Sequence, residues 1–146
     1  GKSYGNINFI PYLQKNSEVN EFMNAINIDL TGLSGAEGWN LPAFNATCLG
    51  KWSIVMNHTS HKDWANKDNC ILIDPDESVP IYDGVFFQEN GIFNQGHMNT
   101  ISEDKMINAF ETAEKMSGKP NKKGVSLIKD FNYKNSLDKI LEIVYE

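Results

Sequence analysis

The stretch that decides the fold is residues 31–51, TGLSGAEGWNLPAFNATCLGK. A short apolar run at residues 28–30 leads into it, and a second run at 54–56 follows it. Between them, three evenly spaced glycines predict a loop. Residues 41–49 predict a helix, because a proline suits the first helical turn and a glycine stands directly after the last position. Strand, glycine loop, helix and strand form the βαβ unit of a nucleotide-type site, where the helix start offers N–H groups to a phosphate.

The flanking sequence continues this alternation of strands and helices. We expect further strands at residues 7–10 and 70–73, and helices at 17–26, 60–65, 103–117 and 136–144. The third of these helices follows a Thr100–Glu103 capping box, and the last begins near Asn135 or Ser136. Short links between the elements imply an α/β fold: a Rossmann-like parallel sheet covered by helices on both faces.

Two segments break the pattern. Apolar runs at residues 85–88 and 92–93 flank Asn90-Gly91, which is a strong hairpin signal. We therefore expect either a β-hairpin or an irregular insertion around residues 82–96. Residues 124–130 predict a short strand or a loop.

Composition limits the classes of function. The chain has 146 residues, which suits a single domain at 1–146. It carries 19 acidic and 13 basic residues, and the net charge of −6 argues against nonspecific nucleic-acid binding. No apolar run is long enough to predict a membrane span, and no signal peptide is recognisable, so we expect a cytoplasmic protein. Cys48 and Cys70 are expected to be buried thiols.

Residues 37–46, EGWNLPAFNA, followed by Leu49-Gly50-Lys51, resemble the donor-site signature of retaining glycosyltransferase family 4. That signature runs Glu-Gly-aromatic-Gly-Leu-Pro, then Glu-Ala, then Gly-Lys/Arg-Pro-Val. Glu37 is kept, while Asn40 replaces the second glycine and Asn45 replaces the second glutamate. The resemblance covers roughly residues 6–76 and implies part of a GT-B C-terminal domain. The acceptor domain, and the first donor-domain strands with their phosphate-binding basic residues, have no counterpart here.

The resemblance also implies roles for individual residues. Glu37 would contact the hydroxyl groups of the donor sugar and stabilise the oxocarbenium-like charge of a retaining transfer, as the catalytic residue. Asn45 would hold the ribose, with an amide that accepts one hydrogen bond and donates another. The backbone N–H groups of Asn40 and Leu41 would meet the diphosphate. The other expected donor-binding positions are Gly38, Trp39 and Pro42.

Each position also has a purely structural alternative. Glu37 can serve only as a helix cap, Asn45 can be a surface residue, and Trp39 suits packing of the loop better than stacking on a ligand. His58 and His61 lie in a segment that resembles a loop bordering the donor cleft, where they either line the cleft or face solvent. As metal ligands they would need a third protein partner, so no metal and no cofactor is expected.

Two functions remain open on the sequence. The first is the donor-binding part of a transferase that uses a nucleotide-diphosphate sugar and needs an acceptor domain, from a partner subunit or from a longer parent protein. The second is a non-catalytic or degenerate module that binds a nucleotide or a partner subunit, or that has lost ligand binding altogether. Because the missing strands would leave a sheet edge exposed, a homo-oligomer is also expected.

Overall fold

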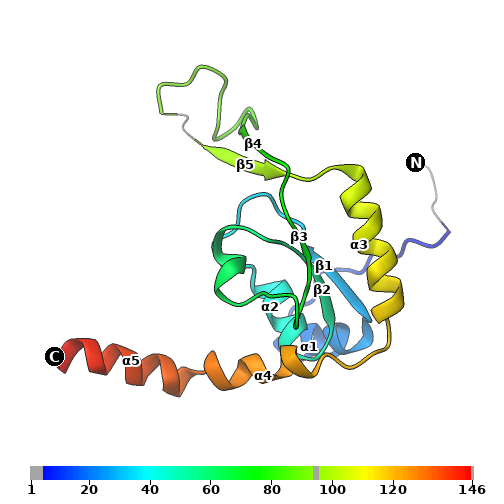
Figure 1. Cartoon of the computed structure of the whole chain (residues 1–146), viewed down its shortest axis with the longest axis vertical. Coiled ribbons are helices and arrows are strands. Elements are labelled where there is room, and N and C mark those ends of the chain that lie inside the picture. The colour runs from blue at the N-terminus through cyan, green and yellow to red at the C-terminus, as the bar shows by residue number, and fades with distance from the viewer. Residues whose placement is uncertain (1–4, 94–95, 146) are drawn as a thin grey trace.

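A parallel three-stranded sheet forms the centre of the computed structural model, which describes residues 5–93 and 96–145. Its order is β1 (Ile28–Gly32), β2 (Trp52–Met56) and β3 (Ile71–Ile73). Ile28 of β1 lies opposite Trp52, and Ile54 of β2 lies opposite Ile71. The parallel sheet and its helices confirm the predicted α/β class (Figure 1).

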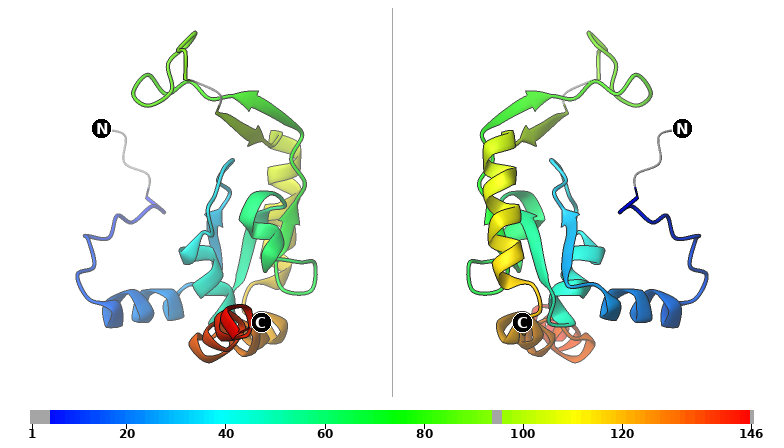
Figure 2. Two further views of the ribbon diagram at one scale, coloured as in Figure 1. Left: turned by 90° about the vertical axis from the view of Figure 1, so that its left-hand side faces the viewer. Right: turned by 90° about the vertical axis from the view of Figure 1, so that its right-hand side faces the viewer.

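Helices cover both faces of this sheet. Helix α2 (Leu41–Cys48) packs on one face and α3 (Glu103–Met116) on the other (Figure 2). Because successive side chains of a strand point to opposite faces, Ile54 and Val55 belong to two different cores. The core under α2 contains Ala43, Val55, Trp64, Ala65, Cys70 and Leu127. The core under α3 contains Ile54, Ile71, Ile73, Ala109 and Ala113.

Helix α4 (Lys122–Asp130) occupies the segment where a short strand or a loop was predicted, and that prediction was wrong. Gly124 has low helix propensity, which hides the helix in the sequence. The glycine is needed because α4 lies close to α2: a Cβ at position 124 would stand 2.4 Å from the Thr47 carbonyl oxygen. Helix α5 (Tyr133–Tyr145) follows, and begins before the expected Asn135 or Ser136.

The N-terminal part of the chain differs from expectation in one respect. Residues 7–10 form no strand, because no strand of the described chain lies beside them to supply hydrogen bonds. The segment runs clear of the sheet before α1 (Asn16–Ala25), as Figure 2 shows.

The predicted helix at residues 60–65 is a short 3₁₀ helix, η1 (Thr59–Asp63).

The predicted insertion around residues 82–96 is an irregular loop, and its apolar runs form no hairpin. The two strands that bracket it lie outside those runs: β4 (Glu77–Pro80) pairs antiparallel with β5 (His97–Thr100). We call residues 77–100 the arm; its residues 94 and 95 lie outside the described chain. The sequence predicted that Thr100 would cap helix α3. Thr100 instead belongs to β5, and α3 begins after Ser102.

The tip of the arm is organised by one carboxylate. Asp83 accepts the backbone N–H groups of Val85, Phe86 and Phe87 at 2.8 to 2.9 Å. These bonds favour the charged form and lower the pKa of Asp83, with the Phe87 bond the largest cause. A closed turn therefore takes the place of the expected hairpin end.

One buried amide holds α4 to the sheet. Asn121 Oδ1 accepts from the Gly124 N–H at 2.8 Å and caps the helix, while Nδ2 donates to the carbonyls of Lys51 and Asn69 at 2.9 and 2.7 Å. These bonds join the chain ahead of β2, the chain ahead of β3 and the start of α4.

We predict that Asn121→Ala destabilises the protein by about 2–4 kcal/mol, because it removes a cap and leaves buried carbonyls unpaired. Urea unfolding followed by circular dichroism measures the change. Asn108→Ala, at an exposed position on α3, is the matched control and should change stability by less than about 0.5 kcal/mol. Equal stability of the two variants would contradict the role of Asn121.

Candidate functional site

Two segments meet at the carboxyl edge of the sheet. The glycine loop, residues 33–40, joins β1 to α2, and the clamp segment, residues 57–64, follows β2. In open α/β sheets, ligands bind at this edge. Most of the residues predicted for the site lie in these two segments.

Asn40 closes the base of the glycine loop. Its φ of 62° is left-handed, a conformation that Asn tolerates better than most residues, which explains why it can stand where the signature has glycine. The side chain donates to the Thr31 carbonyl at 2.7 Å and accepts from the Ala43 N–H at 3.2 Å. It is only 7% exposed, so it turns into the protein and not toward an approaching ligand.

The start of α2 keeps unused donors. Within the described chain, no hydrogen bond is formed by the backbone N–H groups of Asn40 and Leu41. Pro42 has no N–H to offer, and the Ala43 N–H is taken by Asn40. Two backbone donors at a helix N-terminus are therefore available to an anion.

The clamp segment holds the glycine loop through its side chains. Three of them donate to loop carbonyls: His58 Nε2 to Ser34 at 3.1 Å, Ser60 Oγ to Glu37 at 3.1 Å, and Trp64 Nε1 to Trp39 at 3.2 Å. The backbone of Glu37 is thus fixed, while its side chain stays half-buried. The backbone of Glu37 therefore lies beside the segment that carries His58 and His61.

Both histidines are buried, and each has one ring nitrogen without a partner. His61 is 0% exposed, and its Nδ1 donates to the Met56 carbonyl at 2.8 Å while Nε2 has no hydrogen bond. His58 is 4% exposed, and its Nδ1 has none. The ring centres are 5.9 Å apart. Burial lowers the pKa of His61; the bond to Met56 raises it, His58 lowers it, and the charge of Glu37 raises it.

Trp39 belongs to an aromatic cluster that supports the loop. Its ring meets those of Phe44 and Phe131 edge to face, with centres 5.5 and 5.4 Å apart. Phe44 makes a similar contact with Trp64. Trp39 thus packs in the protein, as the alternative interpretation of this residue expects.

Asn45 lies apart from the histidines. It is exposed on α2 and lines a hollow of about 400 Å³ between α1 and α2. The other residues that line this hollow are Asn16, Val19, Asn20, Met23, Cys48, Leu49 and Ile128. Gly38, by contrast, lies in the loop with open space where a Cβ would stand.

Sequence reasoning missed two residues that shape the site. Asn99 of the arm donates its N–H to the Gly35 carbonyl at 2.9 Å, so the arm borders the glycine loop. Asp29 of β1 is buried; burial raises its pKa, and hydrogen bonds from Thr31 and Ser53 lower it. Asp29 could have been noticed in the sequence, because it is an acidic residue between two apolar ones. The contact between Asn99 and Gly35 joins residues 64 positions apart, so no local pattern in the sequence indicates it.

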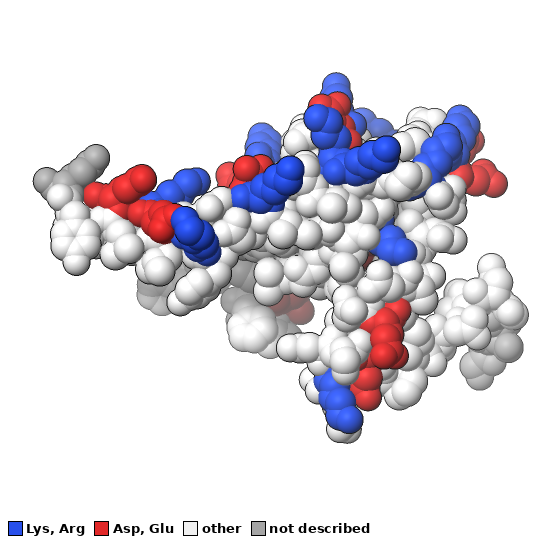
Figure 3. Space-filling model, turned by 90° about the horizontal axis from the view of Figure 1, so that it is seen from below, with Lys and Arg blue, Asp and Glu red and all other residues white. Residues whose placement is uncertain are grey.

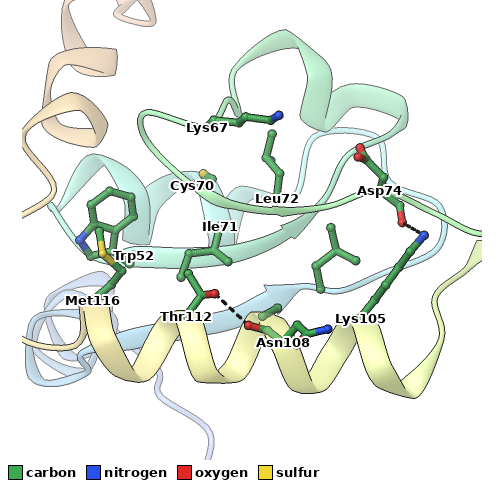
Figure 4. Close-up of a pocket in the computed structure, with 12 residues that line it drawn as sticks. Trp52, Lys67, Cys70, Ile71, Leu72, Asp74, Lys105, Asn108, Thr112 and Met116 are labelled. Atoms are coloured by element: carbon green, nitrogen blue, oxygen red, sulfur yellow. Dashed lines mark hydrogen bonds between the residues drawn. The ribbon is translucent and has the colours of Figure 1, made fainter.

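A separate groove lies between β3 and α3. It has a volume of about 510 Å³, with Ile71, Ile73 and Ala109 among its lining residues (Figure 4). At its rim, Lys105 donates to the Asp74 carbonyl at 2.9 Å. None of the residues predicted for the site lines this groove.

Two further findings concern residues 5–93 and 96–145. No group of three His, Cys, Asp or Glu side chains there is arranged to hold a metal ion. No helix there combines the length and the apolar character that crossing a membrane requires.

Comparison with models of known protein families gives no match, and comparison with curated proteins gives none either.

We predict that Asn40→Gly lowers stability by about 1–2 kcal/mol, through the loss of two hydrogen bonds. Asn40→Ala should lower stability by about 1 kcal/mol more than Asn40→Gly, because the left-handed backbone at this position is unfavourable for alanine. Chemical unfolding of both variants tests this order. If alanine were tolerated as well as glycine at position 40, the backbone constraint would be refuted.

We predict that Asp29→Asn stabilises the protein at pH 7, because it removes a charge from a buried position. The folded state raises the pKa of Asp29, so ionisation costs stability as the pH rises from below about 3.9 through the raised folded value. The advantage of the variant should therefore vanish below that range. Thermal unfolding from pH 3 to pH 7 measures it, with Asp68→Asn on an exposed turn as the control. An equal advantage at all pH values would contradict the prediction.

Proposed function

We propose that the chain is the donor-binding part of a retaining glycosyltransferase and binds a nucleotide-diphosphate sugar at the carboxyl edge of its sheet. One observation carries this proposal: the glycine loop ends in a helix start whose Asn40 and Leu41 N–H groups have no partner. A diphosphate complements such donors and the positive end of the helix dipole. The resemblance of residues 37–51 to the family 4 signature supports the same function.

The remaining roles follow from position. Glu37 would lie at the sugar, where a carboxylate can stabilise developing positive charge. Asn45 would bind the ribose, in a hollow whose volume of about 400 Å³ suits a small molecule. Transfer also needs an acceptor domain, and a cytoplasmic location remains a prediction.

A second candidate function, protein binding without catalysis, has its own support. Large apolar side chains are exposed on three segments. Phe9, in the segment before α1, is 93% exposed, and Phe93, on the arm, is 94% exposed. The third segment is α5, which exposes Ile140, Leu141 and Val144. Figure 3 shows charged side chains along one edge of the surface seen from below and a smaller charged group near the opposite edge, with a broad uncharged area between them. Such a surface suits contact with another protein.

Calorimetry with UDP, GDP and ADP, and with their glucose or mannose conjugates, tests the first proposal. We expect saturable binding of one nucleotide series. Asn45→Ala should weaken it, while Asn108→Ala, on the helix that covers the other face, should not. If none of these compounds binds to folded protein, donor binding is refuted and the protein-binding function is favoured.

Gly38→Ala gives a sharper test of where the ligand lies. A Cβ at this position meets nothing within 4 Å, so the variant should keep its stability to within about 0.5 kcal/mol. If the ligand approaches the loop backbone closely, the added methyl group should weaken nucleotide-sugar binding by about tenfold. Unchanged affinity would place the ligand elsewhere.

A further inference from the structure

The hydrogen bonds of His58 and His61 decide where each ring carries its proton. A carbonyl oxygen only accepts, so Nδ1 of His61, bonded to Met56, is protonated, and Nε2 of His58, bonded to Ser34, is protonated. In a neutral ring the other nitrogen is then a bare acceptor. The two bare nitrogens are Nδ1 of His58 and Nε2 of His61, and neither has a partner.

Two such nitrogens in one site call for an explanation. Nearly all buried polar groups in proteins are paired, because leaving one unpaired lowers stability. Here the two rings are adjacent, with centres 5.9 Å apart, and both belong to the clamp segment that holds the glycine loop. The unpaired atoms therefore mark the candidate site and not a remote part of the core.

The chemistry of the missing partner follows from the acceptors. A bare imidazole nitrogen needs a donor, and a hydroxyl group is a donor of suitable size. An ionised phosphate oxygen only accepts, so a diphosphate does not complement these atoms. The unpaired N–H groups of Asn40 and Leu41 have the opposite polarity and suit the diphosphate.

We propose that His58 Nδ1 and His61 Nε2 accept hydrogen bonds from two hydroxyl groups of the donor's sugar, and so select for the sugar. This rests on the proposed function, since the sugar arrives as a nucleotide conjugate. The histidines are binding residues, and Glu37 on the facing loop keeps the role proposed above.

The sugar reaches these atoms only if the glycine loop moves. The loop is held by three side-chain bonds from the clamp segment and by the Asn99 N–H of the arm, and Gly38 lies in open space. Water can replace the bonds to Glu37, Trp39 and Gly35, whereas the bond of His58 to Ser34 must persist, because it keeps the proton on Nε2. Sugar binding is thus coupled to opening of the loop.

Nitrogen-15 NMR of the imidazole rings, on the whole chain, tests the proposal directly. The probes are glucose and mannose alone, the free nucleotide diphosphates, and the nucleotide-hexose conjugates. We expect the hexoses and the conjugates to shift the signals of the bare nitrogens of His58 and His61. The free diphosphates should leave these signals in place.

Two variants separate the acceptor role from the structural role. His61→Asn keeps a donor near Met56, and His58→Gln keeps a donor near Ser34, while each removes the bare nitrogen. Each should weaken binding of the nucleotide-hexose by about 10- to 100-fold and leave binding of the free diphosphate unchanged. Asn108→Ala, on the helix that covers the other face of the sheet, should change neither affinity.

The outcomes separate this inference from the proposed function. If free diphosphates bind but sugars neither shift the histidine signals nor add affinity, the inference is overturned and the proposed function stands. If hexoses shift the signals but no nucleotide binds, the hydroxyl site stands and the proposed function fails. Equal loss of both affinities in the variants, or a shift caused by Zn²⁺ but by no sugar, would also overturn the inference.

Discussion

The amide of Asn40 is the constraint on which the site depends. By donating to Thr31 and accepting from Ala43, it joins the end of β1 to the start of α2 across a left-handed turn. The glycine loop must then leave and return at neighbouring points, which brings it against the clamp segment. The unpaired N–H groups at the start of α2 follow from the same turn, because the side chain faces inward.

The fold uses this device twice. Asn121 caps α4 through the third residue after the cap position, as Asn40 caps α2, and both amides donate to a backbone carbonyl beside the sheet. In each case one buried amide accepts from a helix N–H and donates to a carbonyl beside the sheet, which joins helix and sheet closely. Gly124 completes the second junction by admitting α4 against α2.

The sequence predicted what local chemistry controls. Glycine and proline punctuation defined β1, α2 and β2, and the resemblance brought Glu37, His58 and His61 into one site. The sequence did not predict α4, because Gly124 disfavours a helix and is present to let α4 lie close to α2. The sequence also predicted a strand at residues 7–10, because a short apolar run says nothing about whether a neighbouring strand exists. The pairing of β4 with β5, and the loss of partners at two histidine nitrogens, depend on residues far apart in the chain, and no local pattern records them.

The contact between arm and loop has a consequence for how the protein can be observed. The Asn99 amide proton is held by the Gly35 carbonyl, at the base of an arm whose apolar tip is exposed. Exchange of this proton with solvent therefore counts how often the loop separates from the arm. A molecule that binds the arm more tightly when the loop is separated from it lowers the free energy of loop opening. By linkage, opening of the loop then raises the affinity of the arm for that molecule to the same extent.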